Sequence, residues 1–227
     1  MTIKNIISAA VIPAVSGKKY TGVIFDFDGV IADTEKYHYL SWREAFSVFG
    51  VDITEEEYYP LRSTGRAATI NAVSRNHGLV FSPEETARIS EIKGESYNRY
   101  VEGLTDADLL PGIREYLDFL LGTNVKLGIA SSSKFVREEL SLFRLDACFA
   151  CDSVIDGNCD IRKKPAPDIY LEAAGRLGIS PSEGLVFEDS LVGVEAGLAA
   201  GFDVVKVGGA QDPRTLATVT DFRSLMR

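Results

Sequence analysis

The sequence predicts an α/β fold, a doubly wound parallel sheet with a small helical cap domain inserted after the first strand. Short apolar runs have the continuous hydrophobicity of strands buried on both faces, and they occur at residues 23–25, 125–130, 185–187 and 204–207. Segments with apolar residues at helical spacing precede and separate the last three runs, and this alternation is typical of a parallel sheet. The segment 34–105 departs from the alternation, because it contains helical patterns and no convincing buried strand.

The strand at 23–25 is followed by the segment 34–105, in which strands and helices do not alternate. Its first helix stops at Gly50 and presents one apolar face, formed by Tyr39, Trp42, Ala45, Phe46 and Phe49. More helical sequence follows at residues 70–73 and 82–100. Since ligands of open α/β sheets bind beyond the carboxyl ends of the strands, a domain inserted here should lie over the site as a lid. We therefore expect a core domain of residues 1–33 and 106–227 and a cap domain of residues 34–105.

Helices precede or connect the later strands. Helix starts are expected after Gly112, after the run at 125–130, at Asp168, and at residue 191, and Gly178 fits as the end of the third helix. Apolar residues recur at helical spacing in the first two of these helices: Ile113, Leu117 and Leu120, then Val136, Leu140 and Phe143.

Composition excludes several classes of protein. The 227 residues, 45% of them hydrophobic, can bury a sizeable core, and the length fits one large domain or one domain with a small insertion. No apolar run reaches the ~18 residues that a membrane span needs. The formal net charge of −9 repels phosphate backbones. We expect a monomer that binds neither nucleic acid nor membranes, and any anionic ligand would need local positive charge.

The cysteines indicate a reducing compartment. The chain contains only Cys148, Cys151 and Cys159, an odd number that does not suit a disulfide framework. A zinc site needs four ligands, and the two histidines, His38 and His77, lie far upstream. We expect reduced thiols in or near a core, in a cytoplasmic protein.

The N-terminal segment carries no assigned role. Residues 6–15 resemble the apolar region of a short signal peptide, but the preceding positive region is weak and Pro13 interrupts the run. An extra edge strand or a loose arm ahead of the domain is the alternative. Residues 1–20 remain without a function.

The first strand ends in a pair of carboxylates. Asp26 and Asp28 are two positions apart, so their side chains point the same way from an extended backbone, and Gly29 lets the chain turn close to a ligand. Two acids this close raise the pKa of one another unless a cation holds them. One can then be an ionised nucleophile on a metal and the other a proton carrier, although an Asp-rich turn would give the same pattern.

Three further segments add groups that bind phosphate or metal. Ser131 follows a strand and can bind a phosphoryl oxygen, or it can cap the next helix. Lys164 is a cation before a proline that biases it to extended backbone, or part of a solvated basic turn. Glu188 and Asp189 end a strand; their oxygens suit Mg²⁺, although they could also cap the helix at 191–200.

These four segments, in this order, resemble the haloacid-dehalogenase-type phosphatase superfamily over nearly the whole chain after residue 20. The resemblance implies a Rossmann-like core and phosphoryl transfer through an aspartyl-phosphate. Asp26 would attack phosphorus, and Asp28 would give a proton to the leaving oxygen and later take one from the acceptor. Ser131 and Lys164 would bind the phosphoryl oxygens.

The resemblance also implies Mg²⁺ as the cofactor. The ion would lie on Asp26, the backbone carbonyl of Asp28 and Asp189, with Glu188 beside them. Such transition states need positioning and neutralisation of charge. Dehalogenation is disfavoured, because that branch lacks an Asp two residues after its nucleophile.

More narrowly, the chain resembles the β-phosphoglucomutase branch. Residues 34–38 followed by Trp42 are similar to its hinge and first lid helix, residues 63–66 to its lid loop, and Lys93 followed by Tyr97 to its lid lysine. The substrate-binding residues that this likeness implies are Thr34, His38, Trp42, Arg66, Lys93, Ser133 and Lys134.

The likeness implies a role for the lid. Arg66 would grip the phosphate that is not transferred while Asp26 acts on the other, and His38 near the hinge could couple Asp28 to lid closure. From the residues alone, Arg66 could equally lie on a solvated face, Trp42 in the lid core and His38 within a packed helix.

One residue departs from the mutase pattern. This chain has Phe135 where the mutases carry an Asn that helps to hold the distal phosphate, which leaves Ser133 and Lys134 as the grip of the core. We therefore expect an enzyme that acts on a small phosphorylated sugar, either as a mutase or as a related sugar-phosphate phosphatase. The remote alternative is a non-catalytic phosphoacceptor or binding module; receiver domains, however, are shorter and carry their acceptor Asp in mid-chain.

Overall fold

The computed structural model describes residues 20–226, and within them one parallel sheet of six strands forms the centre of the fold. The strands are β1 (Gly22–Phe25), β2 (Lys126–Ala130), β3 (Val154–Ile155), β4 (Gly184–Glu188), β5 (Asp203–Val207) and β6 (Ala217–Val219). Their spatial order is β3-β2-β1-β4-β5-β6 and all neighbours are parallel. The chain thus winds outward from β1 in one direction and then in the other, which confirms the predicted doubly wound sheet.

The sequence did not reveal two of these strands. β3 and β6 contain two and three residues, which is too short to show the apolar run or the alternation by which strands are recognised. Both lie at the edges of the sheet, where pairing with a neighbour, rather than a continuous hydrophobic run, defines the strand.

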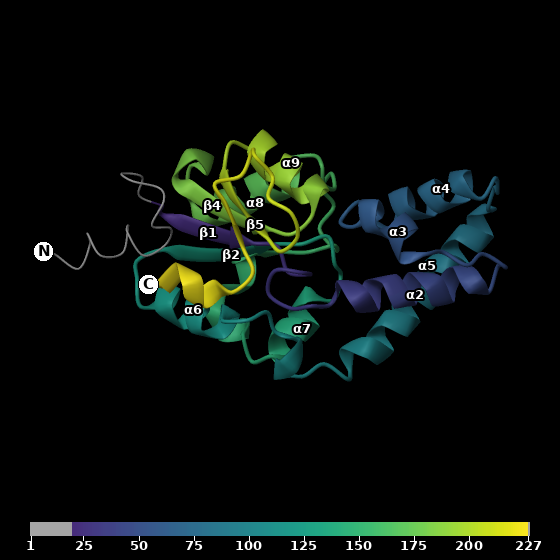
Figure 1. Cartoon of the computed structure of the whole chain (residues 1–227), viewed down its shortest axis with the longest axis horizontal. Coiled ribbons are helices and arrows are strands. Elements are labelled where there is room, and N and C mark those ends of the chain that lie inside the picture. Colours follow the sequence, from purple (N-terminus) through teal and green to yellow (C-terminus); the bar gives the residue numbers. More distant parts are fainter. Residues whose placement is uncertain (1–19, 227) are drawn as a thin grey trace, which may run out of the picture.

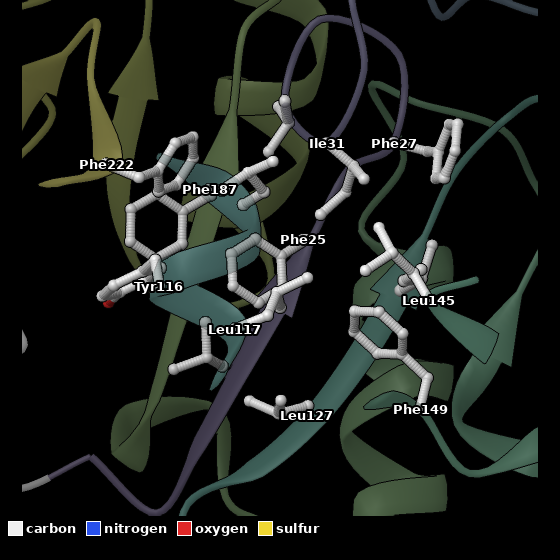
Figure 2. Close-up of a cluster of buried hydrophobic side chains, with 14 of the residues drawn as sticks. Phe25, Phe27, Ile31, Tyr116, Leu117, Leu127, Leu145, Phe149, Phe187 and Phe222 are labelled. Carbon is white, nitrogen blue, oxygen red and sulfur yellow. The ribbon is translucent and has the colours of Figure 1, made fainter. Parts of the chain in front are cut away.

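Successive residues of the central strands face opposite layers of the core. In β1, Val23 and Phe25 join one hydrophobic cluster while Ile24 joins the other. Figure 2 shows the first cluster, in which the Phe25 and Phe187 rings stack at 5.1 Å between centroids. Phe222, from the end of the chain, packs on Phe187 at 5.3 Å. This layer fixes β1 beside β4, and therefore the two strand ends that carry the acidic motifs.

Helices cover both faces of the sheet (Figure 1). α6 (Ile113–Leu121) and α7 (Val136–Leu142) contribute to the first cluster, and α8 (Asp168–Leu177) and α9 (Leu191–Ala199) to the second. Short 3₁₀ helices complete the connections: η1 (Tyr59–Leu61), η2 (Asp106–Asp108), η3 (Asp146–Cys148), η4 (Cys151–Ser153), η5 (Pro181–Glu183) and η6 (Phe222–Met226). In the described part of the chain, no helix is long and apolar enough to cross a membrane.

The inserted cap is helical, as predicted. It consists of α2 (Glu35–Ser47), α3 (Glu55–Tyr58), α4 (Arg66–Asn76) and α5 (Pro83–Val101), which group at one end of the molecule in Figure 1. A hydrophobic cluster of its own holds it together, with Trp42 and Phe46 of α2 against Ile89 of α5. Ser82 and Glu85 form a capping box at the start of α5.

Two linkers connect the cap to the core and lie side by side. The Asp33 amide donates to the Asp108 carbonyl at 2.7 Å, and the Leu110 amide donates to the Ile31 carbonyl at 3.0 Å. Paired linkers of this kind can act as a hinge for the cap. The domain limits at 33/34 and 105/106 remain predictions, and the segment 6–15 lies outside the described residues.

The contact between β4 and α9 depends on a glycine. A Cβ at Gly193 would overlap the carboxylate of Glu188, which is fully buried. The Gly193 amide donates to the hydroxyl of Ser190, the N-cap of α9. α9 can therefore begin directly over the end of β4 only with no side chain at this position.

Substituting Gly193→Ala should lower the free energy of unfolding by about 1–3 kcal/mol, because overpacking a fixed buried carboxylate forces side chains or backbone to shift. Gly175→Ala in α8 is the matched control: nothing lies within 4 Å of the added Cβ, and alanine should stabilise by roughly 0.5–1 kcal/mol. Urea unfolding measures both. Equal stability of the Gly193 variant and the wild type would contradict the packing argument.

Candidate active site

The four predicted motifs meet at the carboxyl edge of the sheet. Asp26 follows β1, Ser131 follows β2, Glu188 ends β4, and Lys164 lies in the loop between β3 and α8. All four side chains are buried. β2 and β4 flank β1 on opposite sides, so these residues surround the point at which the winding of the sheet reverses.

Three carboxylates form the acidic part of the site. Oxygens of Asp26, Glu188 and Asp189 lie within 4.8 Å of one another. The Lys164 ammonium is 2.7 Å from Glu188 Oε2 and 3.1 Å from Asp26 Oδ1. Burial and the charge of Glu188 raise the pKa of Asp26 well above its usual range and that of Asp189 to about 7. Lys164 by itself thus leaves negative charge uncompensated in this cluster.

The acidic cluster fits a divalent cation. Asp26 Oδ1 is buried and has no well-aligned hydrogen bond, despite its proximity to Lys164. All donors in the cluster are carboxylate oxygens, which are the ligands that Mg²⁺ prefers. Within the described residues this is the only group of three metal-ligand side chains, and all three cysteines are free thiols outside it.

A cap residue that the sequence analysis did not assign reaches this cluster. Arg62 Nη1 donates to Asp189 Oδ2 at 2.7 Å, while its guanidinium lies 4.0 Å from the Tyr59 ring centroid. One residue further on, the Ser63 carbonyl accepts a hydrogen bond from the Ser132 hydroxyl of the core at 2.9 Å. The cap loop is therefore closed onto the core. Arg62 directly precedes residues 63–66, the segment similar to the lid loop. This position was the sequence feature from which its role could have been predicted.

Asp28 is outside this cluster and has its own set of hydrogen-bond partners. Its Oδ1 accepts from the Thr34 hydroxyl at 2.6 Å and lies 3.0 Å from His38 Nε2, and its Oδ2 is 3.5 Å from the Ser131 hydroxyl. Burial by itself would raise the pKa of Asp28, but His38 and Thr34 lower it to about 2. Thr34 is fully buried and bonded to Asp28, so the structure places it beside this carboxylate rather than on the cavity wall.

A chain of contacts continues from Asp28 into the cap. The Lys93 ammonium is 2.7 Å from His38 Nδ1, and the His38 ring stacks on Tyr97 at 4.0 Å. Since an ammonium can only donate, His38 Nδ1 accepts and Nε2 carries the proton toward Asp28 whenever Lys93 is charged. Burial and the Arg66 charge lower the pKa of Lys93 to about 7.

A cavity of about 720 Å³ lies between cap and core. Asp28 lies on its wall, together with most of the predicted substrate-binding residues: His38, Trp42, Arg66, Lys93, Ser133 and Lys134. Trp42 also belongs to the cap's hydrophobic cluster, so both interpretations of this residue apply.

The cavity wall also carries cations. Arg66 donates to the Ser90 carbonyl at 2.8 Å, and none of the carboxylates in residues 20–226 forms an ion pair with it. Burial lowers the pKa of its guanidinium. Lys134 and Lys163 line the core side of the same cavity, and Lys163 packs on Gly65 at the start of α4. This arrangement can bind an anionic group at a distance from Asp26.

The sequence analysis also assigned no role to two further acids, the half-buried Glu35 and the buried Glu139. Glu35 lines the cavity and accepts from the Tyr58 hydroxyl at 3.2 Å, and burial and Asp189 raise its pKa well above its usual range. Glu139 lies in the core helix α7 and is fully buried. A signal existed for Glu139, because it falls on the apolar face that Val136, Leu140 and Phe143 define.

Comparison with known proteins agrees with this geometry. Residues 23–207 match the family model described as haloacid dehalogenase-like hydrolase. A β-phosphoglucomutase from Bacillus subtilis (strain 168) is 34% identical over 196 residues, covering 83% of this chain and 84% of the relative. The fructose-1-phosphate phosphatase YqaB from Escherichia coli (strain K12) is 30% identical over 191 residues, covering 84% of this chain and 97% of the relative.

Solved structures give the same result. A crystal structure of β-phosphoglucomutase from Clostridium difficile superposes with a TM-score of 0.84 at 30% sequence identity, covering 91% of this chain and 93% of that chain. The family-model match spans the cap and all four motifs, and together with the relatives it confirms the resemblance noted in the sequence. The chain therefore belongs to the haloacid dehalogenase-like hydrolase family, which comprises phosphatases and phosphotransferases.

Proposed function

We propose that this protein is a Mg²⁺-dependent enzyme that transfers the phosphoryl group of a small sugar phosphate through an aspartyl-phosphate on Asp26, in the manner of a β-phosphoglucomutase. The observation that carries the proposal is a cavity whose wall combines Asp28 with several cations. Arg66, Lys93 and Lys134 lie on this wall, and no carboxylate of residues 20–226 forms an ion pair with Arg66, while Asp26, two residues before Asp28, belongs to the acidic cluster. A sugar carrying phosphate matches this distribution of charge.

Asp26 is the proposed nucleophile. Its carboxylate oxygen forms a bond to phosphorus while the bond from phosphorus to the sugar oxygen breaks. Lys164, already beside Asp26 at 3.1 Å, and Ser131 bind the phosphoryl oxygens. Asp26, the Asp28 backbone carbonyl and Asp189 would hold Mg²⁺, with Glu188 beside them, and the ion would offset the charge of the phosphoryl group.

Asp28 is the proposed proton carrier. The ionised form, which its pKa of about 2 favours, accepts the proton of the hydroxyl that attacks the aspartyl-phosphate. The acid formed in that step can protonate a leaving oxygen in the opposite direction. Thr34 and His38 hold the carboxylate in place through hydrogen bonds of 2.6 Å and 3.0 Å.

The fate of the phosphoryl group depends on the acceptor. A closed cap keeps water from the aspartyl-phosphate until a sugar hydroxyl arrives, and the contact of Ser132 with Ser63 supports such closure. Phe135 favours the second candidate, a sugar-phosphate phosphatase. Its ring packs on Tyr97 at 5.0 Å and gives the distal phosphate no hydrogen bond, so a sugar bisphosphate would be held less firmly.

One product assay separates the two candidates. The protein is mixed with Mg²⁺, β-glucose 1-phosphate and a trace of the corresponding 1,6-bisphosphate. Glucose 6-phosphate without free phosphate identifies a mutase, and free phosphate identifies a phosphatase. If neither product forms with a panel of sugar phosphates, the protein is a non-catalytic phosphate-binding module and the proposal is wrong.

Asp26→Asn should abolish turnover, with a loss of about a thousandfold or more, because the amide is a poor nucleophile toward phosphorus. Asp33→Asn is the matched control, since that carboxylate is 62% exposed, beyond the site, and should retain full activity. Circular dichroism checks that both variants fold. Mg²⁺-dependent turnover in the Asp26 variant would eliminate this residue as the nucleophile.

Arg66→Ala should lower kcat/KM for a sugar phosphate by about a hundredfold, since a bidentate guanidinium–phosphate contact is lost. Hydrolysis of a small aryl phosphate, which does not reach the distal end, should change little. Arg75→Ala, on the exposed surface of the same helix, controls for the charge change. Equal losses on both substrates would exclude a distal-phosphate role.

The pH profile should report Lys93. Because its pKa is lowered to about 7, the ammonium is lost as pH rises through 7, and kcat/KM for a sugar phosphate should fall up to about tenfold per pH unit above it. Lys93→Arg keeps its charge at these pH values and should move the fall to higher pH. An identical alkaline limb in the two proteins would assign it to another group.

A further inference from the structure

Glu139 occupies an unusual position for a carboxyl group. It lies in the middle of α7, on the helix face that Val136 and Leu140 bury in the core, and its exposed fraction is 0%. Burying an acid among apolar side chains costs free energy unless its oxygens are hydrogen-bonded. One oxygen, Oε2, has no hydrogen-bond partner among residues 20–226. A leucine here would satisfy the packing, so packing does not explain the carboxyl group.

The other oxygen connects the core to the cap. Glu139 Oε1 accepts a hydrogen bond of 2.6 Å from the hydroxyl of Tyr97, and Tyr97 belongs to the cap helix α5. Both groups are fully buried. Bulk water therefore does not replace this hydrogen bond while the cap stays closed, which gives the contact more weight than an exposed one.

The Tyr97 ring is the surface against which the cap's polar site residues rest. His38 stacks on it at 4.0 Å with an interplanar angle of 11°, and the Lys93 ammonium lies 4.2 Å from its centroid. The Tyr97 hydroxyl is also 3.5 Å from Asp28 Oδ1. A shift of this ring would displace His38 from Asp28 and Lys93 from His38.

We propose that Glu139 is a positioning residue for phosphoryl transfer: by accepting the Tyr97 hydroxyl, it fixes the cap helix against the core and keeps His38 and Lys93 aligned on Asp28. The inference rests on the proposed function for its catalytic consequence. Glu139 touches neither the cavity nor the acidic cluster, so it acts through Tyr97.

The chemistry of the buried acid supports the design of a conservative variant. Burial and the charge of Asp28 raise the pKa of Glu139 well above its usual range, which favours the neutral form of the acid. Glutamine has the same shape and keeps a carbonyl oxygen for the Tyr97 hydroxyl. Leucine keeps the volume and removes the acceptor, and Tyr97→Phe removes the donor but keeps the ring.

Kinetics with a sugar phosphate test the catalytic consequence. Glu139→Leu and Tyr97→Phe should each lower kcat/KM about tenfold, the double variant should lose no more than either single one, and Glu139→Gln should retain most of the activity. A small aryl phosphate, which depends less on cap closure, should lose less. Additive losses, or a loss in the Gln variant equal to that in the Leu variant, would overturn the role of the hydrogen bond.

Histidine NMR tests the positioning without any turnover. The chain has two histidines, and His77, at the surface of the cap beside Glu57, is an internal reference. At fixed pH, in the substrate-free protein, stacking on Tyr97 should shift the His38 ring protons upfield. Glu139→Leu should move them toward unstacked values, Glu139→Gln should not, and the His77 signals should stay constant and show that the variants fold.

The two measurements separate two kinds of failure. If the wild type turns over no sugar phosphate, the proposed function is wrong, while the His38 signals still decide whether Glu139 positions the stack. Unchanged His38 signals in the Leu variant overturn the positioning role. Displaced signals with unchanged sugar-phosphate kinetics overturn its catalytic consequence.

Discussion

Lys164 lies with its side chain entirely buried between two carboxylates, Asp26 and Glu188, and this ion pair makes the acidic end of the sheet possible. Transferring charges from water into a core is costly, and the cost is offset only where opposite charges and hydrogen bonds meet them. The pairing holds the pKa of Glu188 at about 2, against burial that would raise it. Asp26 and Asp189 retain raised pKa values, because burial and the neighbouring carboxylates disfavour their charged forms, and a bound cation would offset this charge.

Three elements of the core meet at the Glu188 carboxylate. Glu188 accepts from the Tyr170 hydroxyl of α8 at 2.6 Å and from the backbone and hydroxyl of Ser190 at 3.0 Å and 2.7 Å. Gly193 lets α9 approach the group closely. α8, β4 and α9 are thus fixed relative to one another by one buried acid. The residues that stabilise the fold here also orient the site, so stability and chemistry cannot be assigned to separate residues at this edge.

The cavity wall carries positive side chains although the chain as a whole is acidic. The formal net charge is −9, yet the cavity wall carries Arg66, Lys93, Lys134 and Lys163. Such a cluster attracts an anion only over short distances, because salt screens it beyond about 10 Å. An acidic protein can therefore select a small phosphorylated molecule enclosed by the cap while its outer surface repels long polyanions.

The residues along the chain already determine much of this protein. The apolar runs, the helical periodicities and the four motifs at strand ends predict the doubly wound sheet, the inserted cap and the residues that gather at the sheet edge. These features can be predicted because the periods of strands and helices are patterns of nearby residues. The rule that sites form at the carboxyl ends of strands then needs only the order of the elements along the chain. Asp26, Ser131, Lys164 and Glu188 could be found in this way, whereas β3 and β6 were too short to leave a pattern.

Only the tertiary structure decided which side chains face one another across the cap and the core. Arg62 on Asp189 and Tyr97 on Glu139 join positions 127 and 42 residues apart. No sequence periodicity predicts such a pair of residues, because the two side chains meet only when the cap packs against the core. The fold also gives different partners to two acids that are only two positions apart in sequence: Asp28 lies beside Thr34 and His38, whereas Asp26 lies with Glu188 and Asp189. Local pattern thus determines the elements and their chemistry, and long-range packing determines the partners, because burial and pairing energies depend on the whole fold.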